Sequence, residues 1–326
     1  MDAAMNSTIA GTSTLKIVST VVYSFLGSVG VVGNSLVLIV LISVKELRNI
    51  TNLFIVNQSI LDMIASLFLF ANYIAPPLPL PNREWSGRFV CSIWNSGYLF
   101  WGTIISSTYN LVMMSIERYL AVIHPVVYRI KFSYRLAAVV AVSPWIIGFG
   151  YEGHWAAANR YDDGQCNIHY ASTVVQKFTG CLTFTVEFLL PIAVMAFVYI
   201  NIGKSLRLRI ADINHSTTMP SATAESTVNN GNNAGDQPVA PNYREKARKN
   251  VIKTLFIVCV TYAVCWAPNQ VTYLYFNLGG ALDFNGELFS FTVYIAFLNM
   301  CVNPFIYTFK YRKFQKGLKI LFKIRS

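Results

Sequence analysis

Long runs of apolar residues dominate the pattern of hydrophobic and polar positions along the chain. The uncharged runs are 17–44, 89–116, 254–282 and 288–309, and the runs with a single charge are 50–80, containing Asp62, and 178–203, containing Glu187. A helix needs about 20 apolar residues to cross a hydrocarbon core of about 30 Å. Together with a shorter run at 136–151, these runs predict seven membrane-spanning helices.

Composition and charge agree with a membrane protein and predict its orientation. The chain is 54% hydrophobic and only 13% charged, whereas about a quarter of a soluble domain is charged. Seven spans with the N-terminus outside would place twenty of the 26 Lys and Arg residues inside and five outside, with Arg118 at the membrane edge. This positive-inside bias predicts the orientation. The net charge of +11 therefore indicates anionic inner-leaflet lipid rather than nucleic acid as the partner.

The expected organisation has three parts: an outer N-terminus at 1–16, a seven-helix domain at 17–309, and a basic amphipathic helix with a short tail at 310–326. A polar stretch at about 211–243 predicts a disordered inner loop. Asn6 starts the one glycosylation sequon expected outside. We expect no cleaved signal peptide, because no basic start precedes the long first span.

Two of the six cysteines are expected outside the membrane, in an oxidising compartment. They are Cys91 at the outer start of the third span and Cys166 in the second outer loop. We predict a disulfide between them, worth roughly 4 kcal/mol in the loop-entropy picture, which would hold a loop over the mouth of the bundle. Two free thiols are the alternative.

Asp62 lies near the middle of the second span, where ionisable residues are costly and usually functional. Asn34, Ser107, Asn299 and Asn303, from the first, third and seventh spans, are the polar residues placed to face it. Carboxylate, hydroxyl and amide oxygens suit a small monovalent cation with water. The alternative is a protonated aspartic acid that joins helices by hydrogen bonds, and spacing alone leaves both open.

The motifs together resemble those of rhodopsin-like (class A) G-protein-coupled receptors, most of all the peptide-type receptors, over roughly 17–323. The matching pieces are GNSLV at 33–37, Asp62, Cys91, ERY at 117–119, Trp145, Pro191 with Tyr199, CWAP at 265–268 and NPFIY at 303–307. The stretch after NPFIY, with Phe314 as its buried aromatic, resembles the family's membrane-surface helix. The resemblance implies an all-α seven-transmembrane helix bundle with an eighth amphipathic helix. It also implies a plasma-membrane receptor, not an enzyme, that activates heterotrimeric G proteins.

The resemblance assigns a role to the acid–base pair Glu117–Arg118. In the family the acid holds the arginine while the receptor is silent, and on activation the arginine turns toward tyrosines of the fifth and seventh spans, here Tyr199 and Tyr307. Such a pair is a two-state element, and a snorkelling surface pair is the alternative. The other positions matched to activation and coupling are Tyr119, Val126, Tyr262, Pro268 and Pro304. The resemblance also favours a sodium ion among Asp62 and its polar neighbours.

Three departures from the family pattern stand out. The spacing from Cys91 to the ERY motif is two residues longer than usual, so we expect a bulge or extra partial turn there, and either Phe100 or Tyr98 faces the ligand. Tyr262 replaces the usual phenylalanine below the CWAP tryptophan. Arg248 replaces an acid that some receptors use as a second lock, so we expect measurable basal activity.

The expected ligand pocket is aromatic and amide-rich, which suits peptide side chains and backbone. Its residues are Phe100, Trp101, Ile104, Trp266, Asn269, Gln270, Tyr273, Phe289, Val293 and Phe297. Neither third-span candidate is the aspartate that usually anchors amines, and Phe297 replaces the retinal lysine of opsins. For each aromatic residue, a place in the core or against lipid is the alternative.

Glu187 lies one turn before Pro191, on the stretch of the fifth span that usually lines the pocket. A carboxylate there should not face lipid. The outer segments are also acidic, with Asp2, Glu84, Glu152, Asp162, Asp163, Asp283 and Glu287. We therefore expect a ligand with a cationic group, such as a short basic or amidated peptide. A small amine or lipid anchored by Glu187 is the alternative, and so is a glutamic acid bonded to a neighbouring helix.

Other classes of membrane protein fit less well. Transporters commonly have repeated halves with interrupted helices, and channels need a charge ring or a carbonyl filter; we find neither pattern. The four His residues are scattered at edges and in loops without the partners that an enzyme site would need.

Overall fold

A computed structural model describes residues 2–76, 78–81, 83–162, 164–168, 170, 172–218, 241–284 and 286–323, with side chains outside 2–13 and 208–248. Seven of its helices are long and apolar enough to cross a membrane. They are Thr14–Ser43, Ile50–Tyr73, Glu84–Ile123, Tyr134–Ala158, Thr173–Arg207, Lys249–Asn277 and Glu287–Lys310. The prediction of a seven-helix membrane bundle is therefore confirmed, including the fourth span, which is longer than the run at 136–151.

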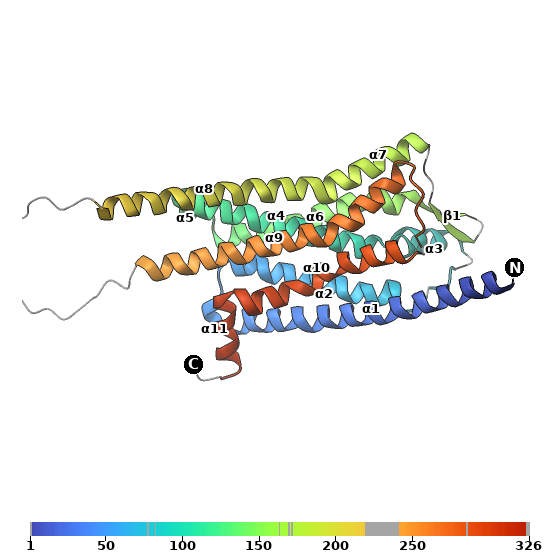
Figure 1. The fold of residues 1–326 in the computed structure, drawn as a ribbon, viewed down its shortest axis with the longest axis horizontal. Coiled ribbons are helices and arrows are strands. Elements are labelled where there is room, and N and C mark those ends of the chain that lie inside the picture. Colours follow the sequence, from blue (N-terminus) through green and yellow to red (C-terminus); the bar gives the residue numbers. More distant parts are fainter. Residues whose placement is uncertain are drawn as a thin grey trace, which may run out of the picture.

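The helices lie side by side in an elongated bundle (Figure 1). Their order is α1 (Asp2–Ser43), η1 (Lys45–Leu47), α2 (Ile50–Tyr73), α3 (Glu84–Phe89), η2 (Val90–Asn95), α4 (Tyr98–Ile123), α5 (Pro125–Lys131), α6 (Tyr134–Ala158), β1 (Asn159–Asp162), β2 (Gln165–Ile168), α7 (Thr173–Thr183), η3 (Phe184–Leu189), α8 (Leu190–Thr218), α9 (Pro241–Asn277), α10 (Glu287–Lys310) and α11 (Arg312–Leu321). Strand β1 and α3 lie at one end, which we call the hairpin end, and α11 lies at the other, the α11 end (Figure 1).

Several boundaries differ from the sequence expectation. Helix α1 begins at Asp2 rather than near 17, and α8 and α9 reach Thr218 and Pro241, so they include both ends of the stretch expected to be a loop at 211–243. Residues 219–240 of that stretch lie outside the described residues. Asn6 falls in the part of α1 whose side chains are not described, so its glycosylation stays a prediction.

A short antiparallel hairpin covers the hairpin end of the bundle. It pairs β1 with β2, with Tyr161 opposite Cys166. Cys166 forms a disulfide with Cys91 at the start of the third span, with a Cα–Cα distance of 5.4 Å. The Tyr161 hydroxyl donates to the Pro81 carbonyl at 3.0 Å. The predicted disulfide is confirmed, and it fixes the hairpin to the third span.

Helix α11 turns away from the direction of α10 at the opposite end (Figure 1). Phe314 is completely buried, and a Cβ added to Gly317 would meet Leu47 and Val40 at 2.5 and 2.9 Å. The close approach of Gly317 lets α11 pack tightly on α1 and η1. The predicted eighth helix, with Phe314 as its buried aromatic, is thus present.

Candidate functional site

A cavity of about 290 Å³ lies at the hairpin end, among eight helical elements of the bundle. Its lining residues are Tyr23, Tyr73, Trp101, Glu152, His154, Trp155, Thr183, Glu187, Asn269, Gln270, Tyr273, Phe284, Phe289, Ser290 and Val293. Seven of these were expected from the sequence: Trp101, Glu187, Asn269, Gln270, Tyr273, Phe289 and Val293. Both aromatic and amide groups line the cavity, as the sequence predicted.

Four expected pocket residues are packed in the core instead of lining the cavity. Phe100 and Phe297 are each 1% exposed, and Trp266 is 3% exposed. The Phe100 and Phe297 rings pack edge to face with ring centres 5.3 Å apart. The Trp101 and Trp266 rings also pack edge to face, with ring centres 6.4 Å apart. Ile104, 5% exposed, is also in the core. These side chains therefore lie below the cavity surface, and Trp101 connects the two layers.

Neither Phe100 nor Tyr98, the two candidates for the ligand-facing position, lines the cavity. The Tyr98 hydroxyl donates to the Phe149 carbonyl at 3.0 Å. The expected bulge is present as the π-helix η2, followed by Gly97 with φ of 71°. A π turn holds one residue more than an α turn, and left-handed Gly97 then breaks the helix. This irregular segment accommodates the longer spacing and brings Trp101 to the cavity.

Two buried carboxylates line the cavity. Glu187 lies in η3, a second π-helical turn, and its Oε2 accepts from Gln270 Nε2 at 3.0 Å. Glu152 is 2% exposed, its Oε2 has no hydrogen-bond partner among the described residues, and its charge interacts with that of Glu187. Counting Glu152 with the outer segments was wrong, because α6 continues to Ala158 and carries this residue into the bundle.

The irregular backbone at Glu187 is stabilised by tyrosines from two other helices. Pro191 has no N–H, so the π turn before it leaves carbonyls without helical donors. The Tyr262 hydroxyl donates to the Glu187 carbonyl, and the Tyr109 hydroxyl donates to the Val186 carbonyl at 2.9 Å. The hydroxyl that distinguishes Tyr262 from a phenylalanine thus joins α9 to the segment that carries Glu187.

A polar cluster surrounds Asp62 in the middle of the bundle. Its Oδ1 accepts from Ser107 Oγ at 2.7 Å and from Gln58 Nε2 at 3.0 Å, and its Oδ2 accepts from Asn303 Nδ2 at 2.8 Å. The buried Oδ1 atoms of Asn34, Asn299 and Asn303 have no hydrogen-bond partner in the described part of the chain. A carboxylate, a hydroxyl and unsatisfied amide oxygens are donor types that fit a small cation, and Asn303 is the amide that contacts Asp62 directly.

Sequence reasoning missed Gln58, which is central to this cluster. It lies one turn before Asp62, is completely buried, donates also to Ser107 Oγ, and accepts from Asn110 Nδ2 at 2.8 Å. Spacing of four residues on a helix would have placed it beside Asp62.

An ion pair occupies the α11 end of α4. Arg118 Nε donates to Glu117 Oε2 at 2.6 Å, and its Nη2 donates to Oε1. The Tyr128 hydroxyl from α5 also donates to Glu117 Oε1. Burial, together with the Glu117 charge, raises the pKa of the Tyr128 hydroxyl above its usual range, so this hydroxyl remains a donor. Tyr128 was not expected from the sequence.

The sequence matches the family described as 7 transmembrane receptor (rhodopsin family) over residues 33–307. This match includes most of the chain, with five spans in full, the last part of the first span and nearly all of the seventh. The chain belongs to the rhodopsin family of seven-transmembrane receptors. Its members are receptors rather than enzymes, and the protein is a multi-pass membrane protein.

Relatives of this receptor include galanin receptor type 1 of Rattus norvegicus, which is 28% identical over 94% of this chain and 83% of its own length. The histamine H2 receptor of Homo sapiens is 27% identical over 95% of this chain and 80% of its length. The cholecystokinin receptor of Xenopus laevis is 26% identical over 91% and 75%, respectively. This receptor is thus about equally similar to proteins named for different ligands.

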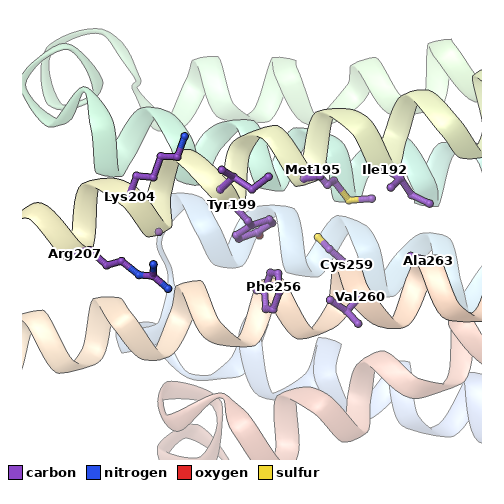
Figure 2. A pocket seen from close by; sticks show the side chains of 12 residues that line it. Ile192, Met195, Tyr199, Lys204, Arg207, Phe256, Cys259, Val260 and Ala263 are labelled. Atoms are coloured by element: carbon purple, nitrogen blue, oxygen red, sulfur yellow. The ribbon is translucent and has the colours of Figure 1, made fainter.

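The receptor's two tyrosines expected to meet Arg118 are in place but not bonded to it. The hydroxyls of Tyr199 and Tyr307 are buried and lack hydrogen-bond partners among the described residues. Tyr199 lies at a groove of about 520 Å³ between α8 and α9 (Figure 2), and its ring packs on Phe256 at 5.6 Å. Both hydroxyls are therefore available for a second arrangement of the arginine.

The receptor presents an apolar surface on α5 at the α11 end. Val126 is 69% exposed and Ile130 is 76% exposed. The sequence predicted the first of these.

Tyr119 packs on Phe197 of α8 with ring centres 6.1 Å apart. Pro268 and Pro304 lie inside α9 and α10, where each removes a backbone donor.

Proposed function

We propose that this receptor binds an extracellular ligand with a cationic group, most simply a short peptide, and activates heterotrimeric G proteins at its α11 end. The observation that carries this proposal is the cavity with buried Glu187. No Lys or Arg occurs among its described lining residues, so a ligand would have to supply the positive charge. Among the relatives reported above, two are named for peptides, galanin and cholecystokinin.

The proposed orientation places the hairpin end outside the cell. The disulfide at that end fits an oxidising compartment. Lys310, Arg312, Lys313, Lys316 and Lys319 gather at α10 and α11, as expected for the inner face of a membrane. The ligand cavity would then open outward and the Glu117–Arg118 pair would lie inward.

A small amine ligand anchored by Glu187 is the second candidate. A cavity of about 290 Å³ lies just below the range for small-molecule sites, which begins at about 300 Å³, so it suits a small amine. One relative is named for histamine. If the ligand is a peptide, the cavity holds only one or two of its side chains, and the rest of the peptide contacts the hairpin.

The test is nucleotide exchange by a panel of heterotrimeric G proteins with the purified receptor and a library of cationic peptides and amines. We expect at least one ligand to raise exchange, and Glu187→Gln to lower its potency about 10-fold, the effect of losing one charged hydrogen bond. Exchange that no ligand and no heterotrimer changes would contradict the receptor function. Unchanged potency in Glu187→Gln would contradict the role of that carboxylate alone.

We also propose that the cluster around Asp62 binds a sodium ion, held by Asp62, Asn34, Ser107, Asn299 and Asn303. The bound ion would supply a positive charge that offsets the buried carboxylate. The unsatisfied Asn oxygens support this reading. The melting temperature of the receptor should be higher in sodium chloride than in choline chloride at equal ionic strength, and Asp62→Asn should remove the difference. An equal difference in the variant would exclude this site.

A further inference from the structure

We propose that Glu152 and Glu187 together form a two-carboxylate subsite that binds a guanidinium group of the ligand. This inference rests on the proposed function in one respect: the cavity must be the ligand site. It adds a residue outside the sequence-predicted site, Glu152, and narrows the cationic group to one chemical class.

The two carboxylates approach the same space from different elements. Glu152 lies near the end of α6 and Glu187 in η3, and both side chains line the cavity. Their relative exposures are 2% and 9%. Both residues line one cavity of about 290 Å³, so a cation bound there would be exposed to the charge of both carboxylates.

Two buried acceptor atoms of the cavity residues lack hydrogen-bond partners among the described residues. Glu187 Oε2 accepts one hydrogen bond, from Gln270, while Glu152 Oε2 is buried and has no partner among the described residues. Gln270 Oε1 is likewise buried without a partner there. Buried acceptors of this kind carry a desolvation cost unless a donor reaches them. Two unpartnered acceptors and the Glu187 carboxylate, all in residues that line one cavity, therefore favour a ligand with several N–H groups.

The described lining residues include no cationic side chain that donates to the two carboxylates. Lys and Arg do not occur among the described residues of the lining. The one imidazole there, His154, is engaged through Nδ1 with the Tyr151 carbonyl at 2.7 Å, and its ring stacks on Trp155 with an interplanar angle of 10°. His154 is thus held against its own helix rather than between the two carboxylates.

A guanidinium fits this arrangement better than an ammonium. It is planar and carries five N–H donors in a fixed fork, so two carboxylates on different sides can each receive hydrogen bonds. An ammonium is a compact, strongly hydrated charge with three donors. The aromatic lining, including Trp101, Trp155 and Tyr73, adds surfaces on which a guanidinium stacks favourably.

The test compares arginine amide with citrulline amide, which has the same shape but a neutral urea in place of the guanidinium. The full-length receptor is purified in detergent, and its melting temperature is measured over a concentration series of each probe. We expect arginine amide to raise the melting temperature and citrulline amide to have a much smaller effect. Equal effects of the two probes, including no effect of either, would overturn the proposal.

Matched variants locate the subsite. Glu152→Gln and Glu187→Gln should each raise the half-saturating concentration of arginine amide about 10-fold or more, because each removes one charged acceptor. Glu84→Gln is the control, since it removes an equal charge at the same end from a side chain that is 72% exposed. A response to arginine amide in Glu152→Gln equal to that of Glu84→Gln would overturn the proposal.

The outcomes separate this inference from the receptor function, because the binding assay contains no G protein. A ligand that drives nucleotide exchange with equal potency in wild type and Glu152→Gln would overturn the subsite and leave the receptor function intact. Selective binding of arginine amide, in a protein that promotes exchange with no heterotrimer, would support the subsite and contradict the receptor function.

Discussion

At the scale of single residues, the Tyr128 hydroxyl is a third member of the ion pair at the α11 end. It shares Glu117 Oε1 with Arg118, so it stabilises the arrangement in which the arginine is held. A hydrogen bond to a charged group contributes about 1.5–3 kcal/mol. Tyr128→Phe should therefore raise ligand-independent nucleotide exchange by about 10-fold or more, and Glu117→Gln should raise it at least as much.

Tyr134→Phe is the matched control for this prediction, because Tyr134 is 54% exposed at the start of α6. It should leave basal exchange unchanged. Basal exchange in Tyr128→Phe equal to that of this control would show that Tyr128 does not restrain the pair.

Gln58 is the residue whose removal should strengthen the proposed sodium site. Its Nε2 donates to Asp62 Oδ1 and to Ser107 Oγ, and it thereby occupies oxygen lone pairs that a cation would use. Gln58→Leu should increase the gain in melting temperature on changing from choline chloride to sodium chloride. A smaller gain than in wild type would mean that Gln58 supports the cation instead of competing with it.

At the scale of elements, the break between η2 and α4 positions Trp101 in the cavity. Gly97 has φ of 71°, and an added Cβ would meet Trp101 Cδ1 at 2.9 Å. A non-glycine residue in this conformation costs about 1–2 kcal/mol. Gly97→Ala should lower the melting temperature and weaken ligand binding, because both the backbone and Trp101 must shift.

Gly150→Ala offers the comparison for Gly97, since a Cβ at Gly150 in α6 meets nothing within 4 Å. Alanine is favoured over glycine inside a helix, so this variant should be neutral or slightly stabilised. If the two variants had the same melting temperature, the conformation at Gly97 would not be a constraint.

Some features of the helices and loops could be predicted from the sequence, and others could not. Span number, the Cys91–Cys166 disulfide and α11 depend on composition and local pattern, and all were predicted. The depth of Phe100 relative to Trp101 was not: the spacing of Cys91 from the ERY motif predicted a bulge, but the position of the π turn, which sets this depth, is not marked by any local motif. Glu152 was misplaced for a related reason: a charged residue after an apolar run suggests a helix end, yet α6 extends beyond it.

At the scale of the whole molecule, the cavity and the ion pair lie at opposite ends of the bundle, so ligand and G protein communicate only through its conformation. Tyr262 is one physical link, because it joins α9 to the backbone of Glu187. If both partners favour the same arrangement, each must raise the affinity of the other by the same factor, typically about 5–150-fold. A ligand bound at the hairpin end then shifts a population that already exists.

This linkage predicts an effect of Glu117→Gln on a distant cavity. Releasing Arg118 raises the fraction of receptor in the ligand-favoured arrangement, and apparent affinity increases in proportion to that fraction. The variant should therefore bind an agonist from the exchange screen more tightly than wild type when no G protein is present. Adding nucleotide-free G protein should improve its affinity by a smaller factor. Equilibrium binding with and without the heterotrimer measures both. Raised basal exchange with unchanged agonist affinity would show that the ion pair restrains only the G-protein surface and is not coupled to the cavity.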